Sequence, residues 1–285
     1  MGRDSRANIA KQTISIGEKG SYQLPSGNSV DIKARVDEAV RGTKLYRPDE
    51  LEDMLAAAEF DAPSFNEGDS TATKIEVTDE TTGAAARRLL QDENEPELMA
   101  LNFASAKNPG GGFQGGARAQ EEDLARCSAL YHCLITQMEY YEINRAEPSM
   151  LYTDHMIYSP GVPFFRDEEG KLIKEPFYPA MITAPAPNAG EALKRDPNAG
   201  DEIAETFMRR VGMVLAIART AGHRRLVLGA WGCGVFRNDP HMVAECFRAW
   251  LEEPRFQGAF ERVVFAVYDT SRDASTRQAF LDCFQ

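Results

Sequence analysis

The chain has 285 residues, 43% of them hydrophobic, and a formal net charge of −12. This length and apolar share suffice for one large or two smaller globular domains, and they exclude a chain that is disordered throughout. The negative charge argues against general binding to nucleic acids or anionic membranes, because the summed field of the protein repels both. Local geometry must therefore hold any anionic ligand.

Cysteine and histidine usage limits the chemistry further. Five cysteines, an odd number with no Cys-x-x-Cys pair, argue against a disulfide framework and fit a reducing compartment. The four histidines lack the spacing of a zinc site. The start of the chain contains no apolar signal-peptide core, and no apolar run is long enough to span a membrane. We therefore expect a cytoplasmic protein with no membrane segment, no metal and no cofactor.

The first elements predicted along the chain are a helix and a hairpin. Residues 5–18 have the apolar spacing of a short helix, which Ser-Ile-Gly-Glu-Lys-Gly at 15–20 should end early. Residues 22–32 are typical of a β-hairpin that turns at 25–27.

A second helix and a boundary follow. Pro48 should begin a helix that extends to Ala58, because proline suits a first helical turn. Residues 61–71 are rich in Pro, Ser, Asn and Gly, which is typical of a linker. We therefore place a boundary between residues 1–60 and 61–285.

Beyond this boundary, short apolar runs alternate with helical stretches. Such alternation predicts an α/β sheet covered by helices on both faces, with ligands gathering at the carboxyl ends of the strands. The predicted strands are residues 74–78, 98–104, 155–158, 180–183, 226–231 and 262–268, and the predicted helices are 82–91, 121–137, 201–221, 240–251 and 272–283.

Glycine-rich segments follow two of the predicted strands, at residues 110–116 and 229–236. Consecutive glycines permit positive φ and close approach of a ligand, so their amides can converge on phosphate oxygens. The first segment leads into a helix near Gln120, whose N-terminus adds a favourable dipole. We predict a diphosphate as the ligand, because neither the Walker pattern nor the dinucleotide fingerprint fits. A plain glycine turn is the alternative.

Glu121 and Glu122 begin the helix that follows the first glycine segment. Neighbouring positions on a helix lie about 100° apart, so the two carboxylates cannot flank a sugar from opposite faces. One is expected to act as general acid to a leaving oxygen, while the other holds ribose hydroxyls. The alternative is a favourable interaction with the helix dipole and nothing more.

The two segments together carry a resemblance to a known family. Asn-Pro-Gly-Gly-Gly at 108–112, followed after seven residues by Gln-Glu-Glu at 120–122, resembles the signature of the poly(ADP-ribose) glycohydrolases. It is most similar to the compact bacterial type, which is built on a macrodomain. Residues 226–240 resemble the second, diphosphate-binding loop of that family. Further blocks agree, at residues 101–107, 155–163, 182–188 and 264–269.

The resemblance implies a macrodomain-like mixed α/β sheet with helices on both faces, with residues 61–285 catalytic and residues 1–60 an accessory segment packed on them. It implies hydrolysis of ribose–ribose O-glycosidic bonds in poly(ADP-ribose), releasing ADP-ribose without metal or cofactor. Glu122 would protonate the leaving oxygen, Glu121 would hydrogen-bond the distal ribose, and Asn108 would hold a hydroxyl of that ribose. The implied partners are poly(ADP-ribose), ADP-ribose and ADP-ribosylated proteins.

For this role Glu122 must start protonated, which burial beside Phe236 and the charge of Glu121 would both favour. Phe236 is expected to press the terminal ribose towards Glu122, and a core phenylalanine is the alternative. Phe113 either covers the ligand or anchors its loop. The predicted substrate-binding residues are Asn108, Gly110, Gly111, Gly112, Phe113, Gln120, Gly232, Cys233, Gly234, Val235, Phe236, Tyr268 and Thr270.

Three rival interpretations remain open. Cys233 lies between two glycines after a strand, as a nucleophile would, but the pattern differs from the nucleophile elbow, which favours a small buried thiol. A macrodomain that only reads ADP-ribose would also have two glycine-rich loops, although reading has no use for the Gln-Glu-Glu triplet. A hydrolase of ADP-ribose attached to a protein or a nucleic-acid base would use the same groups.

Overall fold

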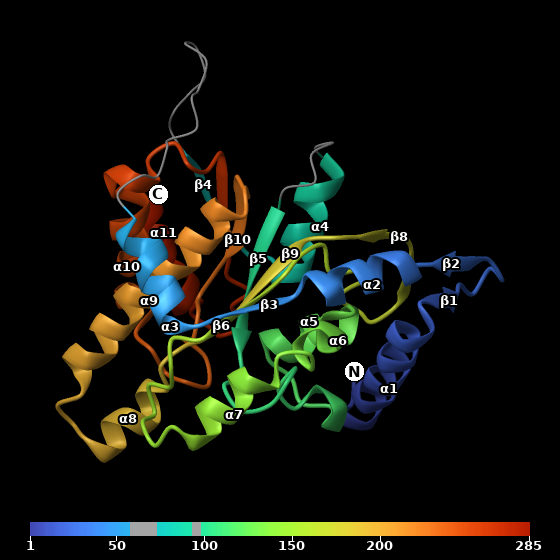
Figure 1. Ribbon diagram of the computed structural model, residues 1–285, viewed down its shortest axis with the longest axis horizontal. Coiled ribbons are helices and arrows are strands. Elements are labelled where there is room, and N and C mark those ends of the chain that lie inside the picture. The colour runs from blue at the N-terminus through green and yellow to red at the C-terminus, as the bar shows by residue number, and fades with distance from the viewer. Residues whose placement is uncertain (58–72, 93–97) are drawn as a thin grey trace, which may run out of the picture.

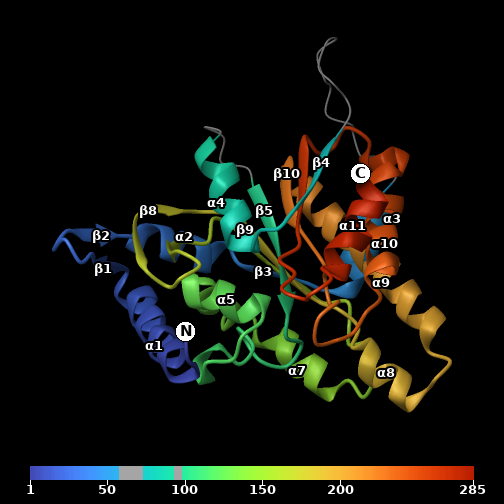
Figure 2. The same ribbon diagram turned by 180° about the vertical axis from the view of Figure 1, so that it is seen from behind.

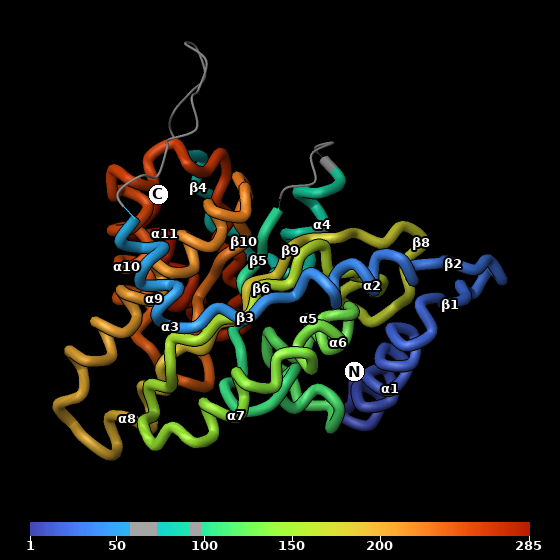
Figure 3. Tube along the Cα trace, in the orientation of Figure 1, coloured from blue at the N-terminus to red at the C-terminus, as the bar shows by residue number. Residues whose placement is uncertain are grey.

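The computed structural model describes residues 1–57, 73–92 and 98–285 (Figure 1). The predicted linker at 61–71, the boundary before it and Ala58 lie outside these residues. In the described part of the chain, no helix is both long and apolar enough to span a membrane. The N-terminus lies beside α1 in the lower part of the view and the C-terminus at the upper left, as the chain trace shows (Figure 3).

A seven-stranded mixed sheet forms the centre, with the strand order β3-β6-β9-β5-β10-β11-β4. The pairs from β9 to β4 are parallel, whereas β6 is antiparallel to both of its neighbours. This topology confirms the predicted mixed α/β sheet. The strands are β3 (Lys44–Tyr46), β4 (Lys74–Thr78), β5 (Leu98–Ala104), β6 (Met156–Ser159), β9 (Ala180–Pro185), β10 (Arg225–Leu228) and β11 (Arg262–Ala266).

Helices cover both faces of the sheet, as the views from the two sides show (Figures 1 and 2). Met99 and Leu101 of β5 pack into an apolar cluster with α3, α9, α10 and α11, whereas Leu98 and Ala100 pack into one with α2 and α4 to α7. A strand buried on both faces is expected to be apolar throughout. The helices are α2 (Lys33–Gly42), α3 (Pro48–Ala56), α4 (Thr82–Asp92), α5 (Gln120–Cys127), α6 (Leu130–Leu134), α7 (Met138–Ala146), α9 (Gly200–Thr220), α10 (Pro240–Glu252) and α11 (Ser275–Phe284).

The first helix, α1 (Arg3–Lys19), runs past the point where it was expected to break. Gly17 serves close packing rather than termination, because a Cβ there would lie 2.2 Å from the ring of His132. The helix ends at Gly20, whose φ of 70° gives the left-handed cap that glycine favours. The hairpin that follows is confirmed by β1 (Ser21–Gln23) and β2 (Ser29–Asp31), which pair antiparallel.

The helix predicted over residues 121–137 is wrong in its length. Ser128 adopts an extended conformation and separates α5 from α6. Its hydroxyl donates to the carbonyl of Leu124 at 2.7 Å and accepts from the amide of Leu130 at 3.2 Å, so the side chain satisfies groups that a continuous helix would have paired. The break lets α5 point its N-terminus at the end of β5 while α6 packs elsewhere.

Several short elements gave no clear sequence signal. The most consequential is β3, which pairs with β6 at the edge of the main sheet, so the segment before the predicted boundary contributes a strand to that sheet. The others are α2, α7, α8 (Ala189–Arg195), the 3₁₀ turns at Phe113–Gly115 and Pro254–Phe256, and the antiparallel pair β7 (Phe164–Arg166) and β8 (Leu172–Phe177).

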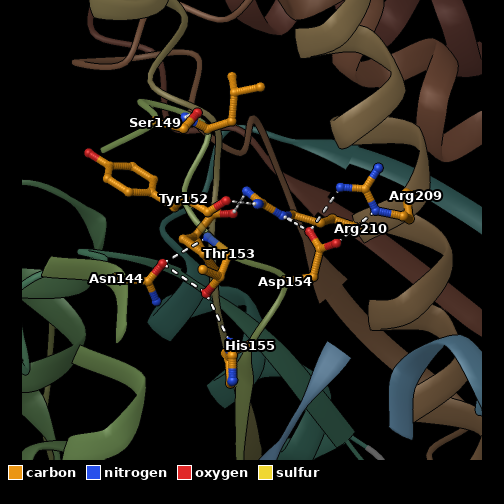
Figure 4. Close-up of polar contacts among 10 residues, drawn as sticks. Asn144, Ser149, Tyr152, Thr153, Asp154, His155, Arg209 and Arg210 are labelled. Carbon is orange, nitrogen blue, oxygen red and sulfur yellow. Dashed lines mark hydrogen bonds and ion pairs between the residues drawn. The ribbon is translucent and has the colours of Figure 1, made fainter. Parts of the chain in front are cut away.

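A buried ion pair ties α9 to the segment before β6 (Figure 4). Asp154 accepts from Arg210 Nε at 2.6 Å, and the Arg210 side chain is 1% exposed. Arg209 binds the same carboxylate at 2.7 Å, but its side chain is 42% exposed. Burial acts to raise the pKa of Asp154, while the two arginines lower it, and the net pKa lies below its ordinary value of 3.8.

We expect Asp154→Ala to lower the free energy of unfolding by about 3–5 kcal/mol, because Arg210 would keep a buried, uncompensated charge. Thermal melting at neutral pH measures the loss. The depressed pKa of Asp154 means that its contribution is present above pH 3.8 and is lost as the pH falls below it. Arg209→Ala is the matched control and should change stability little, since its side chain is partly solvated. Equal losses in both variants would contradict the assignment.

Candidate active site

Both glycine-rich segments line one cavity of about 1140 Å³, and the loop after β11 joins them there. The segments follow β5 and β10, which lie side by side in the sheet and are parallel. Their carboxyl ends therefore open at the same edge, as predicted. Glu121, Glu122 and Phe236 all line this cavity.

The first glycine-rich loop, residues 110–116, is anchored to the core by an aromatic side chain. Phe113 is fully buried and packs against Ala10 and Ala125, with its ring centroid 5.2 Å from that of Tyr131. It does not line the cavity among the described residues. Phe113 therefore anchors the loop, and its prediction as a substrate-binding residue is wrong because its ring has no access to the ligand.

The N-terminal helix also fastens this loop. Arg3 Nε donates to the carbonyl of Gly115 at 2.9 Å, and Arg6 Nε donates to that of Gly116 at 2.8 Å. Gly116 has a φ of 73°, and a Cβ there would lie 2.2 Å from the Arg3 carbonyl oxygen. Helix α1 thus shapes the loop that carries the active-site glycines.

The amides of the first loop bind the protein's own groups. Gly112 donates to Glu122 Oε1 at 2.9 Å, and Gly111 donates to the carbonyl of Asn108 at 2.9 Å. We expected amides at Gly110 to Gly112 to converge on a diphosphate. Of these bonds only the one from Gly112 reaches Glu122, so one amide of this loop positions the Glu122 carboxyl.

Glu121 is 3% exposed, and its carboxyl points back to β5. The Ser105 amide donates to Oε2 at 2.7 Å, and Asn102 Nδ2 donates to Oε1 at 3.2 Å. Burial raises the pKa of Glu121 to about 8; the Ser105 and Asn102 hydrogen bonds oppose this shift, and the charge of Glu122 adds to it. This raised pKa favours the protonated form of Glu121 in the folded state.

The proton on Glu121 should make stability depend on pH. Between about pH 4.5 and 8 the native state keeps a proton that the unfolded chain has lost, so the free energy of unfolding falls as the pH rises. Glu121→Gln is neutral at every pH and lacks this slope. We expect its melting temperature relative to the wild type to increase steadily from pH 5 to pH 8. Parallel melting curves over this range would show that Glu121 is not protonated in the folded state.

Gln120 uses its side chain on the protein. Its Oε1 accepts from the Phe103 amide at 2.8 Å, and its Nε2 donates to the carbonyl of Leu101 at 2.7 Å and to Thr82 Oγ1 at 3.0 Å. These bonds hold the start of α5 to β5 and α4. Gln120 also lines the cavity, so its contact with the substrate stays a prediction.

The second loop, residues 229–238, presents open backbone donors. Gly232 has a φ of 75°, and Asn238 Nδ2 donates to its carbonyl at 3.0 Å and to that of Pro187 at 2.8 Å. In the part of the chain that the structure describes, the amides of residues 234–236 have no acceptor. This loop, rather than the first, offers amides to an anion.

Several more of the predicted site residues line the cavity, and one of them is a buried thiol. Burial raises the pKa of the Cys233 thiol far above its ordinary value, which disfavours the nucleophilic thiolate. Tyr268 and Thr270 lie in the loop after β11 and line the cavity, as does Asn108. Phe236 lines the cavity and packs against Tyr152, with 6.1 Å between ring centroids.

Sequence reasoning missed the residues that support Glu121. Asn102 is fully buried on β5, where it binds Glu121 and donates to Thr183 Oγ1 at 3.2 Å. A polar side chain inside an otherwise apolar strand was the available signal, because burial of an amide requires partners. Ser105 contributes through its backbone, which no sequence pattern reveals.

The fold and this site together define a hydrolase built on a macrodomain-like sheet. The chain belongs to the family described as microbial-type PARG, catalytic domain, whose model matches residues 10–167. PARG denotes poly(ADP-ribose) glycohydrolase.

Crystal structures of this kind of enzyme are similar to the chain. The enzyme from Thermomonospora curvata shares 48% identity with a TM-score of 0.91, and the match covers 99% of this chain and 100% of that one. The complex of that enzyme with the inhibitor ADP-HPD shares 49% identity with a TM-score of 0.88, and the match again covers 99% of this chain and 100% of that one. The enzyme from Deinococcus radiodurans in complex with ADP-ribose shares 48%, with a TM-score of 0.81 and coverage of 90% of this chain and 99% of that one. A comparison with curated proteins returned no match.

Proposed function

We propose that this protein hydrolyses the ribose–ribose O-glycosidic bond of poly(ADP-ribose) and releases ADP-ribose. One observation carries the proposal: a carboxyl pair and a row of open amides line the same cavity. The first can move a proton, and the second can hold a diphosphate. Two of the similar structures hold ADP-ribose or the inhibitor ADP-HPD, which supports this substrate class.

The substrate binds through its diphosphate and its sugars. The amides of Gly234, Val235 and Phe236 receive the diphosphate oxygens, and Gly232 provides the turn that aims these amides inward. The exposed side chain of Asn108 holds a hydroxyl of the distal ribose. We assign the adenine end to the loop after β11, beside Tyr268 and Thr270.

Glu122 is the general acid. It donates a proton to the oxygen that links the two riboses while the bond from that oxygen to the anomeric carbon breaks, leaving an oxocarbenium-like centre. The substrate diphosphate stabilises this positive charge, so a protein nucleophile is not required.

Water completes the reaction. The Glu122 carboxylate accepts a proton from a water molecule as its oxygen bonds to the anomeric carbon, which regenerates the acid and yields ADP-ribose. One water is consumed for each bond cleaved. Glu121 is held by Ser105 and Asn102, and we assign it to hydrogen bonding with the distal ribose.

The cellular setting is part of the proposal. ADP-ribosylated proteins are the expected partners, since they carry the polymer. We place the protein in the cytoplasm, because five free cysteines fit a reducing compartment.

Calorimetry with ADP-ribose, followed by incubation with the polymer and measurement of fragment lengths, tests the function. We expect saturable binding and release of ADP-ribose. Binding without polymer cleavage would make the protein a reader of ADP-ribose. Cleavage restricted to single ADP-ribose adducts on a peptide or a base would make it an adduct hydrolase.

Phe236→Ala should lower kcat by about 10- to 100-fold while changing the Kd for ADP-ribose by less than about tenfold, because the ring presses the ribose towards Glu122. Steady-state kinetics with the polymer and calorimetry measure the two effects. A variant that melts earlier but keeps normal specific activity in its folded fraction would favour the role of a core phenylalanine.

A further inference from the structure

Tyr152, in the segment before β6, has a backbone conformation that its side chain disfavours. Its φ of 62° lies in the left-handed region, which non-glycine residues other than asparagine and aspartate seldom adopt. Such strain persists only where surrounding contacts impose it, and it is frequent at functional sites.

A buried polar network imposes this conformation (Figure 4). Arg210 Nη2 donates to the carbonyl of Tyr152 at 3.0 Å, and Asp154 holds the same guanidinium. On the other side of the peptide, the amide of Thr153 donates to Asn144 Oδ1 at 2.9 Å. Arg210, Thr153 and Asn144 belong to three different parts of the chain, so the packed fold holds the Tyr152 carbonyl and the next amide in place.

The ring of Tyr152 packs against a ring that lines the cavity. It is tilted by 42° against the ring of Phe236, and among the described residues Tyr152 does not line the cavity. The backbone of Phe236 is fixed separately, since its carbonyl accepts from the Gly190 amide at 2.9 Å. The backbone is therefore held by α8, while the ring of Phe236 packs against Tyr152 and against the apolar core cluster.

We propose that Tyr152 is a positioning residue, which keeps the Phe236 ring in the orientation that presses the terminal ribose towards Glu122. This inference rests on the proposed function of Phe236. It gives the strained backbone a purpose: glycine at this position would fit the φ without strain, but it would offer no ring. It also connects the Asp154–Arg210 ion pair, which does not touch the cavity, to catalysis.

A double-mutant cycle tests the inference on the full chain. Tyr152→Gly removes the ring and also relieves the strain, so the melting temperature should stay within about 2 °C of the wild type. We expect kcat on the polymer to fall about 5- to 20-fold while the Kd for ADP-ribose changes less than about threefold. In the Phe236→Ala background the same substitution should change kcat by less than about twofold, because its effect passes through the missing ring.

Two controls sharpen the cycle. Tyr152→Phe keeps the ring and should have the same kcat as the wild type, since no partner of the Tyr152 hydroxyl is found in the described residues. Arg209→Ala leaves the Arg210 contact in place and should also be as fast as the wild type.

The outcomes separate this inference from the proposed function. Wild-type kcat in Tyr152→Gly together with a slow Phe236→Ala would overturn the inference and leave the function intact. If Tyr152→Gly lowered kcat as much in the Phe236→Ala background as in the wild type, the inference would also be overturned, because Tyr152 would then act without the Phe236 ring. If Phe236→Ala kept the wild-type kcat, the ring of Phe236 would have no role in pressing the ribose towards Glu122. The inference about Tyr152 would then fail as well.

Discussion

Glu122→Gln is expected to lower kcat for polymer hydrolysis by about 10²- to 10⁴-fold, the range that general acid–base catalysis usually contributes. The amide keeps the size of the carboxyl, so the cavity and the contact with the Gly112 loop should change little. It cannot give a proton to the leaving ribose oxygen. Single-turnover measurements with labelled polymer follow the chemical step directly.

The affinity of Glu122→Gln for ADP-ribose and a matched control variant show whether the loss is specific to the chemical step. The Kd for ADP-ribose should stay within about tenfold of the wild type, because the proton matters mainly in the transition state. Glu142→Gln makes the same exchange on an exposed position of α7 and should leave both values unchanged. Turnover near the wild-type rate in Glu122→Gln would take the acid role away from this residue.

Gly111→Ala should lower kcat by about 10²-fold or more, although it adds only a methyl group. Its Cβ would lie 2.3 Å from Glu122 Oε1 and 3.1 Å from Glu121 Oε2. The flexible carboxyl of Glu122 will move aside, and a shift of about 1 Å in a reacting group can cost 10²-fold. The φ of 60° at Gly111 adds strain of about 1–2 kcal/mol.

The same loop offers a control for this prediction. Gly115 has open space around its Cβ direction and no positive φ, so Gly115→Ala should keep both activity and stability. Polymer hydrolysis and thermal melting of the two variants measure the difference. Full activity in Gly111→Ala would show that Glu122 does not need its observed position.

Together these two substitutions address what the first loop does. A carboxyl that must give and take back a proton needs a fixed direction, and the Gly112 amide provides one at 2.9 Å. Arg3 and Arg6 hold the far side of the loop. We therefore view α1 as part of the catalytic machinery, acting through the loop rather than on the substrate.

Strands and helices with strong local signals could be predicted from the sequence. The run at 98–104 became β5, because a strand buried on both faces needs a continuous apolar sequence. The run at 74–78 became β4, a half-buried strand at the edge of the sheet in which Ile75 and Val77 alternate with polar residues. The weak elements could not be predicted. β3 has only three residues, and what makes it a strand is its partner β6, more than 100 positions away.

The roles of the individual residues in the site were predicted less well. The motif placed Glu121 and Glu122 at the start of a helix, which the structure confirms. It could not show that the buried member of the pair is Glu121, because burial depends on how α5 lies against β5. For the same reason Phe113 was taken for a ligand contact, although its ring fills the core.

The sequence by itself determined the alternation of strands and helices, the two glycine-rich loops at the strand ends and the carboxyl pair after the first loop, because periodicity and glycine content are local properties. The tertiary structure decided which amides stay open, which carboxyl is buried and what supports Phe236. Hydrogen-bond satisfaction, burial and electric field arise from groups that are distant in the chain and meet only when it folds.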